Sequence, residues 1–191
     1  MISIILLLIL AWSFYIGYSR GVVLQIFYCF SSVLALLVAA GSYKKLASIF
    51  YLWIPFANAT EGSSTYYFDS KYLFDLDQIF YAGLAFLTIY LLVYIIMRFL
   101  GIFMHLVRFI DPETTKMNLV SGILSVLVTI ISLQLALTIL ATIPVPLVQD
   151  TLHKSFVANA IINTPLTSQW LRQLWVINTI GWGLSLLFLN K

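Results

Sequence analysis

Residues 2–41 read ISIILLLILAWSFYIGYSRGVVLQIFYCFSSVLALLVAAG and contain a single charged side chain, Arg20. A helix needs about 20 predominantly apolar residues to cross the hydrocarbon core of a bilayer, which is about 30 Å thick. The segments 2–18 and 22–41 approach that length, and only the tripeptide 19–21 separates them. They are therefore predicted to be two transmembrane helices joined as a tight antiparallel hairpin.

The whole chain shares this apolar character. It has 191 residues, of which 62% are hydrophobic and 9% are charged, whereas a soluble domain carries about 25% charged residues. Lipid must therefore replace water over much of the surface. The length suits a single membrane domain, residues 1–191, and leaves no room for a separate soluble enzyme domain.

Two further apolar runs cover residues 78–97 and 119–143, and Pro144 and Pro146 end the second. Lipid cannot satisfy exposed backbone groups, so each run is predicted to span as a helix. The first continues to residue 110 as an amphipathic extension. The predicted fold class is an all-α integral membrane protein, a bundle of about four transmembrane helices with additional interfacial helices.

The C-terminal region 147–191 is predicted to lie at the membrane interface. Residues 147–163 are expected to form one short surface helix. Residues 174–189 are apolar but short, and Asn178 and two glycines interrupt them. Both a fifth crossing and an interfacial or re-entrant helix are open for this last segment.

Basic side chains mark one side of the predicted bundle. Arg98, Gly101, His105 and Arg108 follow one another at spacings that place them on one helical face. Four crossings put them on the same side as Arg20. They are candidates for contact with anionic lipid or with a partner protein, although Arg20 can also simply snorkel to the interface. We expect this side to face the cytoplasm, because its charges lie in short links.

Small residues mark the predicted helix contacts, because they let two backbones approach closely in lipid. The candidates for packing are Gly17, Gly21, Ser121, Gly122, Ser125 and Thr129. A polar lumen is the alternative interpretation of the serine and threonine face, but no ionisable residue joins it. Gln25 and Gln134 are the deepest uncharged polar side chains and are each predicted to find an interhelical hydrogen bond.

The sequence contains no recognisable catalytic constellation. There is no phosphate-binding glycine-rich loop, no carboxylate pair within an apolar helix and no Ser, His and Asp arrangement of familiar spacing. Two histidines without an acidic cluster make a poor metal site. The ten basic residues are spread along the chain and form no nucleic-acid patch. We therefore expect a protein that is not an enzyme and has no metal, cofactor or nucleic-acid partner.

The order of these elements resembles the colicin V production protein (CvpA) family over roughly residues 1–175. The resemblance rests on Gly-Tyr-Ser-Arg-Gly at 17–21, on the long loop and the extended third helix, and on Ser-Phe-Val-Ala-Asn-Ala-Ile-Ile-Asn-Thr-Pro at 155–165. The chain departs from the family where Met117-Asn118 replaces an Asp-Arg pair, and where Ser121 and Ser125 replace glycines. The role of that charge pair therefore does not carry over.

The resemblance implies a multi-pass protein of the bacterial inner (cytoplasmic) membrane, associated with production of a secreted peptide toxin or bacteriocin and with envelope homeostasis. It brings no catalytic residue. The first hypothesis is a non-enzymatic accessory protein that contacts membrane lipids, another copy of itself or other envelope or export proteins. The alternative is a channel or passive transporter formed by an oligomer. A membrane enzyme would need a nucleophile or metal cluster facing a cavity.

Overall fold

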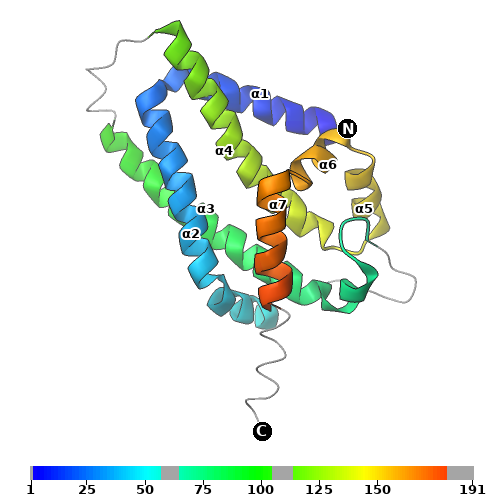
Figure 1. The fold of residues 1–191 in the computed structure, drawn as a ribbon. Helices are drawn as coiled ribbons and strands as arrows, with labels where there is room; N and C mark the ends of the chain where they lie inside the picture. The colour runs from blue at the N-terminus through cyan, green and yellow to red at the C-terminus, as the bar shows by residue number, and fades with distance from the viewer. Residues whose placement is uncertain (1, 57–64, 105–113, 180–191) are drawn as a thin grey trace.

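The computed structural model describes residues 2–56, 65–104 and 114–179, and within these ranges every regular element is a helix. Four long helices form the framework (Figure 1): α1 (Ile2–Arg20), α2 (Val22–Trp53), α3 (Leu76–Met104) and α4 (Thr115–Ala141). The shorter elements are the 3₁₀ helix η1 (Ser70–Asp75), the helices α5 (Pro146–His153), α6 (Phe156–Ile162) and α7 (Pro165–Arg172), and the π-helical turn η3 (Gln173–Ile177).

Each of the four long helices is long and apolar enough to cross a membrane. Their backbone groups are hydrogen-bonded within the helix itself, which is what a hydrocarbon environment requires. The prediction of an all-α membrane protein with four spanning helices is confirmed.

Helix α2 is longer than predicted. It runs without a break from Val22 to Trp53, beyond the predicted end at residue 41. The lysines at 44 and 45 make the segment polar, but polarity does not end a helix when no proline or turn residue follows. Ile54 takes an extended conformation (φ −107°, ψ 120°) because Pro55 comes next. The 32 residues of α2 measure about 48 Å at 1.5 Å per residue, which exceeds the hydrocarbon core.

The other predicted boundaries shift by smaller amounts. Helix α3 begins at Leu76 and includes the first part of the predicted extension, up to Met104, while residues 105–110 lie outside the described residues. Helix α4 begins at Thr115 rather than at 119 and ends at Ala141, before the prolines.

The prediction of one surface helix over 147–163 is wrong. The chain breaks after His153, and α6 begins at Phe156 with Ser155 as its N-cap. The Ser155 hydroxyl accepts a hydrogen bond from the backbone N–H of Ala158 (3.1 Å), which satisfies a helix-start donor that has no partner inside the helix. The possible fifth crossing at 174–189 lies mostly outside the described residues.

The long helices pack as two pairs, with α4 in contact with both. Helix α1 packs mainly against α4, and α2 mainly against α3, while α4 also contacts α2 and α3. In Figure 1, α1 and α2 diverge from their turn, and α4 runs between them. The predicted tight hairpin of α1 and α2 is therefore wrong in its packing. The turn at Gly21, which has a φ of 89°, reverses the chain, but α4 covers α1.

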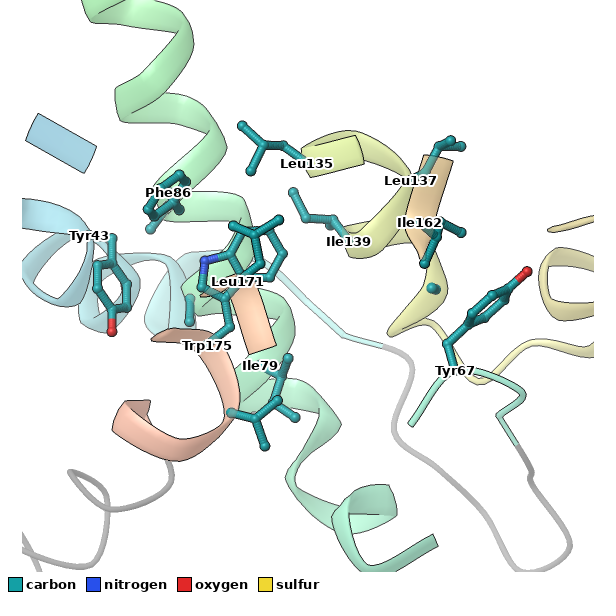
Figure 2. Close-up of a cluster of buried hydrophobic side chains, with 14 of the residues drawn as sticks. Tyr43, Tyr67, Ile79, Phe86, Leu135, Leu137, Ile139, Ile162, Leu171 and Trp175 are labelled. Carbon is teal, nitrogen blue, oxygen red and sulfur yellow. The ribbon is translucent and has the colours of Figure 1, made fainter. Parts of the chain in front are cut away.

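The short C-terminal elements pack against different spanning helices: α5 and α6 contact α4, α6 also contacts α1, and η3 contacts α3. Trp175 of η3 is 1% exposed, and its ring centroid lies 5.7 Å from that of Phe86 on α3. Figure 2 shows Trp175 with Phe86 on one side and Ile139 of α4 on the other. The Tyr43 hydroxyl of α2 donates to the backbone carbonyl of Leu174 (2.9 Å). These contacts bind the end of the described chain to three of the spanning helices.

Candidate functional site

Two arginines converge on one aromatic ring at the end of the molecule where α1 ends and α2 begins. The guanidinium carbon of Arg20 lies 4.8 Å from the centroid of the Tyr28 ring, and that of Arg98 lies 5.5 Å from it. Tyr28 is only 5% exposed. A cation near the face of an aromatic ring is attracted by its quadrupole, and more strongly when water is excluded. The ring thus lies close to two like charges, of which Arg20 is half-buried and Arg98 is exposed.

Three helices build this arrangement. Arg20 is the last residue of α1 and directly precedes the turn, and Tyr28 follows about two turns into α2. Gly101 of α3 makes room for the tyrosine, since a Cβ atom there would lie 2.8 Å from the Tyr28 hydroxyl oxygen. The missing side chain lets the ring approach α3 within one turn of Arg98.

The ion pairs of the described residues do not involve these two guanidinium groups. The ion pairs among the described residues join Lys71 to Asp69 (3.3 Å) and Lys154 to Asp150 (3.7 Å). Over residues 2–56, 65–104 and 114–179, no carboxylate forms an ion pair with Arg20 or Arg98. Both cations are therefore available for an anion that does not come from this part of the chain.

A hollow of about 220 Å³, here called the arginine hollow, opens beside the two cations. All four spanning helices contribute to it, and its polar lining comprises Ser13, Arg20, Gln25, Tyr94, Arg98, Ser125 and Thr129. Ile9 and Trp12 of α1 lie on its apolar side. The hollow thus combines positive charge with uncharged hydrogen-bonding groups.

Gln25 is unusual among the residues that line the arginine hollow. It is 2% exposed, and its side-chain oxygen Oε1 has no hydrogen-bond partner in the described part of the chain. The predicted interhelical bond is therefore not made by this oxygen. Gln134 does form such bonds: its Nε2 donates to the Ile162 carbonyl (3.4 Å), and its Oε1 accepts from the Thr167 hydroxyl. A buried acceptor without a donor costs free energy.

A second, apolar groove of about 350 Å³ lies between α2 and α3. It is lined by Tyr28, Ile95, Arg98, Phe99 and Ile102. Arg98 lines both this α2–α3 groove and the arginine hollow. Arg98 therefore lies between a polar space, the arginine hollow, and an apolar one, the α2–α3 groove.

The small residues form the contact between α1 and α4. A Cβ atom on Gly17 would lie 2.8 Å from the Ser121 carbonyl oxygen and 3.1 Å from Cα of Gly122. The Ser121 hydroxyl donates to the carbonyl of Gly17 (2.6 Å), which lies in the last turn of α1. The Gly21 carbonyl, which also accepts from the backbone N–H of Gln25, lies 2.9 Å from the same hydroxyl oxygen. The two backbones thus meet with hydrogen bonds across the seam.

The polar face of α4 continues along α1. The Ser13 hydroxyl lies 3.0 Å from the Ser125 hydroxyl and 2.6 Å from that of Thr129. Further along α4, the Ser132 hydroxyl lies 3.0 Å from the Tyr90 hydroxyl of α3. These side chains are bonded to neighbouring helices of the same chain, which favours the packing interpretation over a lumen.

The structure brings together some of the residues predicted as sites and leaves others undescribed. Arg20 and Arg98 meet at Tyr28. The six small residues predicted for packing, Gly17, Gly21, Ser121, Gly122, Ser125 and Thr129, lie along the contact of α4 with α1 and its turn. The remaining two predicted contact residues, His105 and Arg108, lie outside the described residues.

Sequence reasoning missed Tyr28 and a polar cluster at the opposite end of the bundle. Nε2 of Gln149 donates to the carbonyls of Ala141 (2.9 Å) and Ile143 (2.8 Å), and its Oε1 accepts from the backbone N–H of Tyr66 (3.2 Å). Gln149 thereby satisfies carbonyls at the end of α4 and ties them to the segment before η1. Its only signal in the sequence is a position just after Pro144 and Pro146.

Asn159 ties the same region together from within the 155–165 motif. Its Nδ2 donates to the carbonyls of His153 (2.7 Å) and Ser155 (3.1 Å). Its Oδ1 accepts from the Tyr67 hydroxyl (2.6 Å). Burial raises the pKa of the Tyr67 phenol, so this hydroxyl remains a donor at neutral pH. The motif residue Asn159 thus has a structural role in joining α5, α6 and the segment before η1.

These observations define a multi-pass helical membrane protein with a cationic hollow at one end of its bundle. The sequence model of the colicin V production protein family matches residues 2–165, and the chain belongs to this family. The resemblance inferred from residues 17–21 and 155–165 is thereby confirmed.

A relative of this chain is known by sequence. The chain is 30% identical over 176 residues to the uncharacterized transmembrane protein YshB of Bacillus subtilis (strain 168). The alignment covers 92% of this chain and 97% of that protein. No solved structure matches the chain significantly.

Proposed function

We propose that this chain is a non-enzymatic accessory protein of the bacterial cytoplasmic membrane that supports production or export of a secreted peptide toxin and the integrity of the cell envelope. Its family points to this role. The observation that carries the proposal is the convergence of Arg20 and Arg98 on Tyr28 without a carboxylate partner in the described chain. This end of the bundle is the contact surface for lipid, for a second copy or for an export protein.

A charge reversal at the contact surface tests the proposal in cells. In a strain that lacks the native gene, the double variant Arg20→Glu/Arg98→Glu is expected to insert but to fail to restore toxin release and resistance to a large, normally excluded antibiotic. The reason is that two anions replace the only described cations around Tyr28. Toxin in the medium, antibiotic sensitivity and the amount of protein in membranes are measured together.

The matched control is Lys45→Glu/Arg172→Glu. It makes the same change in net charge at two exposed basic residues on α2 and α7, remote from Tyr28, and it is expected to behave as wild type. Full complementation by Arg20→Glu/Arg98→Glu at wild-type protein levels would refute a role for this surface.

An oligomeric channel is the competing function. It predicts flux of a small solute through purified protein in liposomes, along the serine and threonine face of α4. The hydrogen bonds of Ser13 with Ser125 and Thr129 occupy that face within one chain, which supports the accessory role. Measurable flux that Ser125→Val abolishes would favour the channel instead.

A further inference from the structure

We propose that the arginine hollow binds the headgroup of an anionic, hydroxyl-bearing phospholipid of the phosphatidylglycerol type, with an acyl chain in the α2–α3 groove. This inference rests on the proposed function, because it identifies what the Arg20–Arg98 surface contacts. It adds a defined ligand chemistry to that surface.

The phosphate is recognised by the two guanidinium groups. Arg20 and Arg98 both lie near the Tyr28 ring and both line the arginine hollow, so positive charge from two helices reaches the same hollow. Guanidinium groups bind phosphate oxygens through paired, charge-assisted hydrogen bonds. The start of α2 lies beside Arg20, and its N-cap residue Gly21 supplies no side-chain bond to the first N–H groups. The helix start therefore adds a further attraction for an anion.

Gln25 indicates that the ligand also carries a donor. Its buried Oε1 lacks a hydrogen-bond partner in the described chain and cannot be satisfied by an ionised phosphodiester, which only accepts. A headgroup hydroxyl supplies the missing donor. A headgroup ammonium would also donate, but it would lie close to two guanidinium groups and be repelled by them. A neutral glycerol hydroxyl on an anionic phosphodiester fits both requirements.

The position and size of the hollow favour a membrane lipid over a soluble phosphate. Arg20 ends α1, so the charged part of the hollow lies at the end of a spanning helix, where lipid headgroups are, while Ile9 and Trp12 line it deeper along the same helix. Trp12 of the lining is 65% exposed and faces outward from the bundle. The volume of about 220 Å³ is below the roughly 300–1,000 Å³ of sites that enclose a whole small ligand. It suits a headgroup, and the α2–α3 groove, which shares Arg98, suits the chain that follows.

Native mass spectrometry of the full chain in detergent tests the assignment. Protein is mixed with equal amounts of phosphatidylglycerol and phosphatidylethanolamine of the same acyl chains, and retained lipid is counted. We expect wild type to retain phosphatidylglycerol preferentially. Arg20→Gln/Arg98→Gln is expected to weaken this binding by about tenfold or more, as the loss of charge-assisted hydrogen bonds implies. The control Lys45→Gln/Arg172→Gln is expected to keep it.

Two further variants separate recognition from folding. Arg20→Lys/Arg98→Lys keeps both charges but loses the paired guanidinium geometry, and it is expected to bind with intermediate strength. Gln25→Leu keeps the volume and removes the acceptor. It is expected to lower the preference for phosphatidylglycerol over phosphatidylmethanol, a phosphodiester whose headgroup has no hydroxyl, while leaving phosphatidylmethanol binding unchanged. An unchanged preference in Gln25→Leu would overturn the hydroxyl assignment.

Several results would overturn the lipid site itself. The first is equal retention of the two lipids by the wild-type protein, and the second is undiminished retention by Arg20→Gln/Arg98→Gln. The third is displacement of the lipid by equimolar glycerol phosphate, which would show that a free anion is the ligand. A different result would refute the proposed function without refuting the lipid site. If the arginine variant loses lipid but still complements the deletion strain, the site binds lipid and the accessory role of this surface is wrong.

Discussion

Gly17 lies at a close approach of α1 to α4. Its neighbours across the seam include backbone atoms, the carbonyl of Ser121 and Cα of Gly122, which cannot move aside as a flexible side chain can. Gly41 provides the opposite case, because a Cβ atom there would meet nothing within 4 Å. The same residue type therefore has a packing role at one position and none at the other.

Gly17→Ala is expected to destabilise the protein by about 1–3 kcal/mol, the usual cost of forcing an additional carbon into a packed interface. Gly41→Ala is the matched control and is expected to stay within about 0.5 kcal/mol of wild type or to be slightly stabilising. Unfolding of the purified proteins in mixed micelles by increasing denaturing detergent, followed by circular dichroism, measures both. Equal stability of Gly17→Ala and wild type would show that the seam relaxes freely.

At the scale of a secondary-structure element, Trp175 is the large, fully buried side chain of the α7–η3 segment. Trp175 contacts Phe86 of α3, and Gly83 leaves the space that the indole occupies, since a Cβ atom there would lie 3.0 Å from its ring. The indole Nε1 of Trp175 has no hydrogen-bond partner within the described ranges. The anchor therefore acts through packing rather than through a polar bond.

Trp175→Ala is expected to cost about 3–5 kcal/mol and to release α7–η3 from the bundle, as loss of a large buried side chain leaves a cavity. Trp175→Phe is expected to cost far less, because it keeps a ring and removes an N–H without a partner. Limited proteolysis of reconstituted protein reports the release, and Trp53→Ala, at an 81% exposed position, is the control. Protection of Trp175→Ala equal to that of Trp53→Ala would contradict the anchoring role.

At the scale of the whole molecule, the two ends of the bundle carry different polar groups. The end of α1, the start of α2, the last turns of α3 and the start of α4 lie together at one end, as Figure 1 shows. The polar cluster around Gln149 and Asn159 lies at the other end, where α4 stops and the short helices begin. One end thus presents the arginine hollow, and the other is closed by hydrogen bonds within the chain.

This division makes a topology prediction. In a Cys29→Ser background, Lys116→Cys in the first turn of α4 and Lys154→Cys beyond its end are expected to react with a membrane-impermeant maleimide from opposite sides, because α4 crosses between them. We expect Lys154→Cys to react in intact cells and Lys116→Cys only in inverted vesicles, in line with the basic residues in the short links. Labelling of both from the same side would exclude a crossing by α4.

The sequence predicted the positions of the spanning helices better than it predicted where each helix ends. The spanning helices were predictable because crossing the hydrocarbon core requires long apolar helices. Such helices appear in the sequence as consecutive apolar residues, for example 2–18 and 119–143. The end of α2 was not predictable, since Lys44 and Lys45 resemble the start of a loop although no residue breaks the helix before Pro55. A helix continues until something stops it, and charge alone does not.

The candidate site was only half predictable. Arg20 and Arg98 were recognisable as cations near one end of the bundle, but Tyr28, between them, looked like any aromatic residue of a spanning helix. Their meeting depends on how α1, α2 and α3 diverge and rotate, which no local pattern encodes. The unpartnered oxygen of Gln25 is likewise a property of the assembled helices.

The sequence by itself determined that this protein is embedded in a bilayer and crosses it with four helices. The reason is that the lipid environment constrains the apolar composition and the length of each spanning segment, and both are properties of consecutive residues. Only the tertiary structure decided that α4 rather than α2 covers α1, and that two arginines share one ring beside a polar hollow. Lipid is as apolar as leucine and gives helices no preference among neighbours. That choice therefore falls to close contacts such as Gly17 with Ser121, which join residues far apart in the chain.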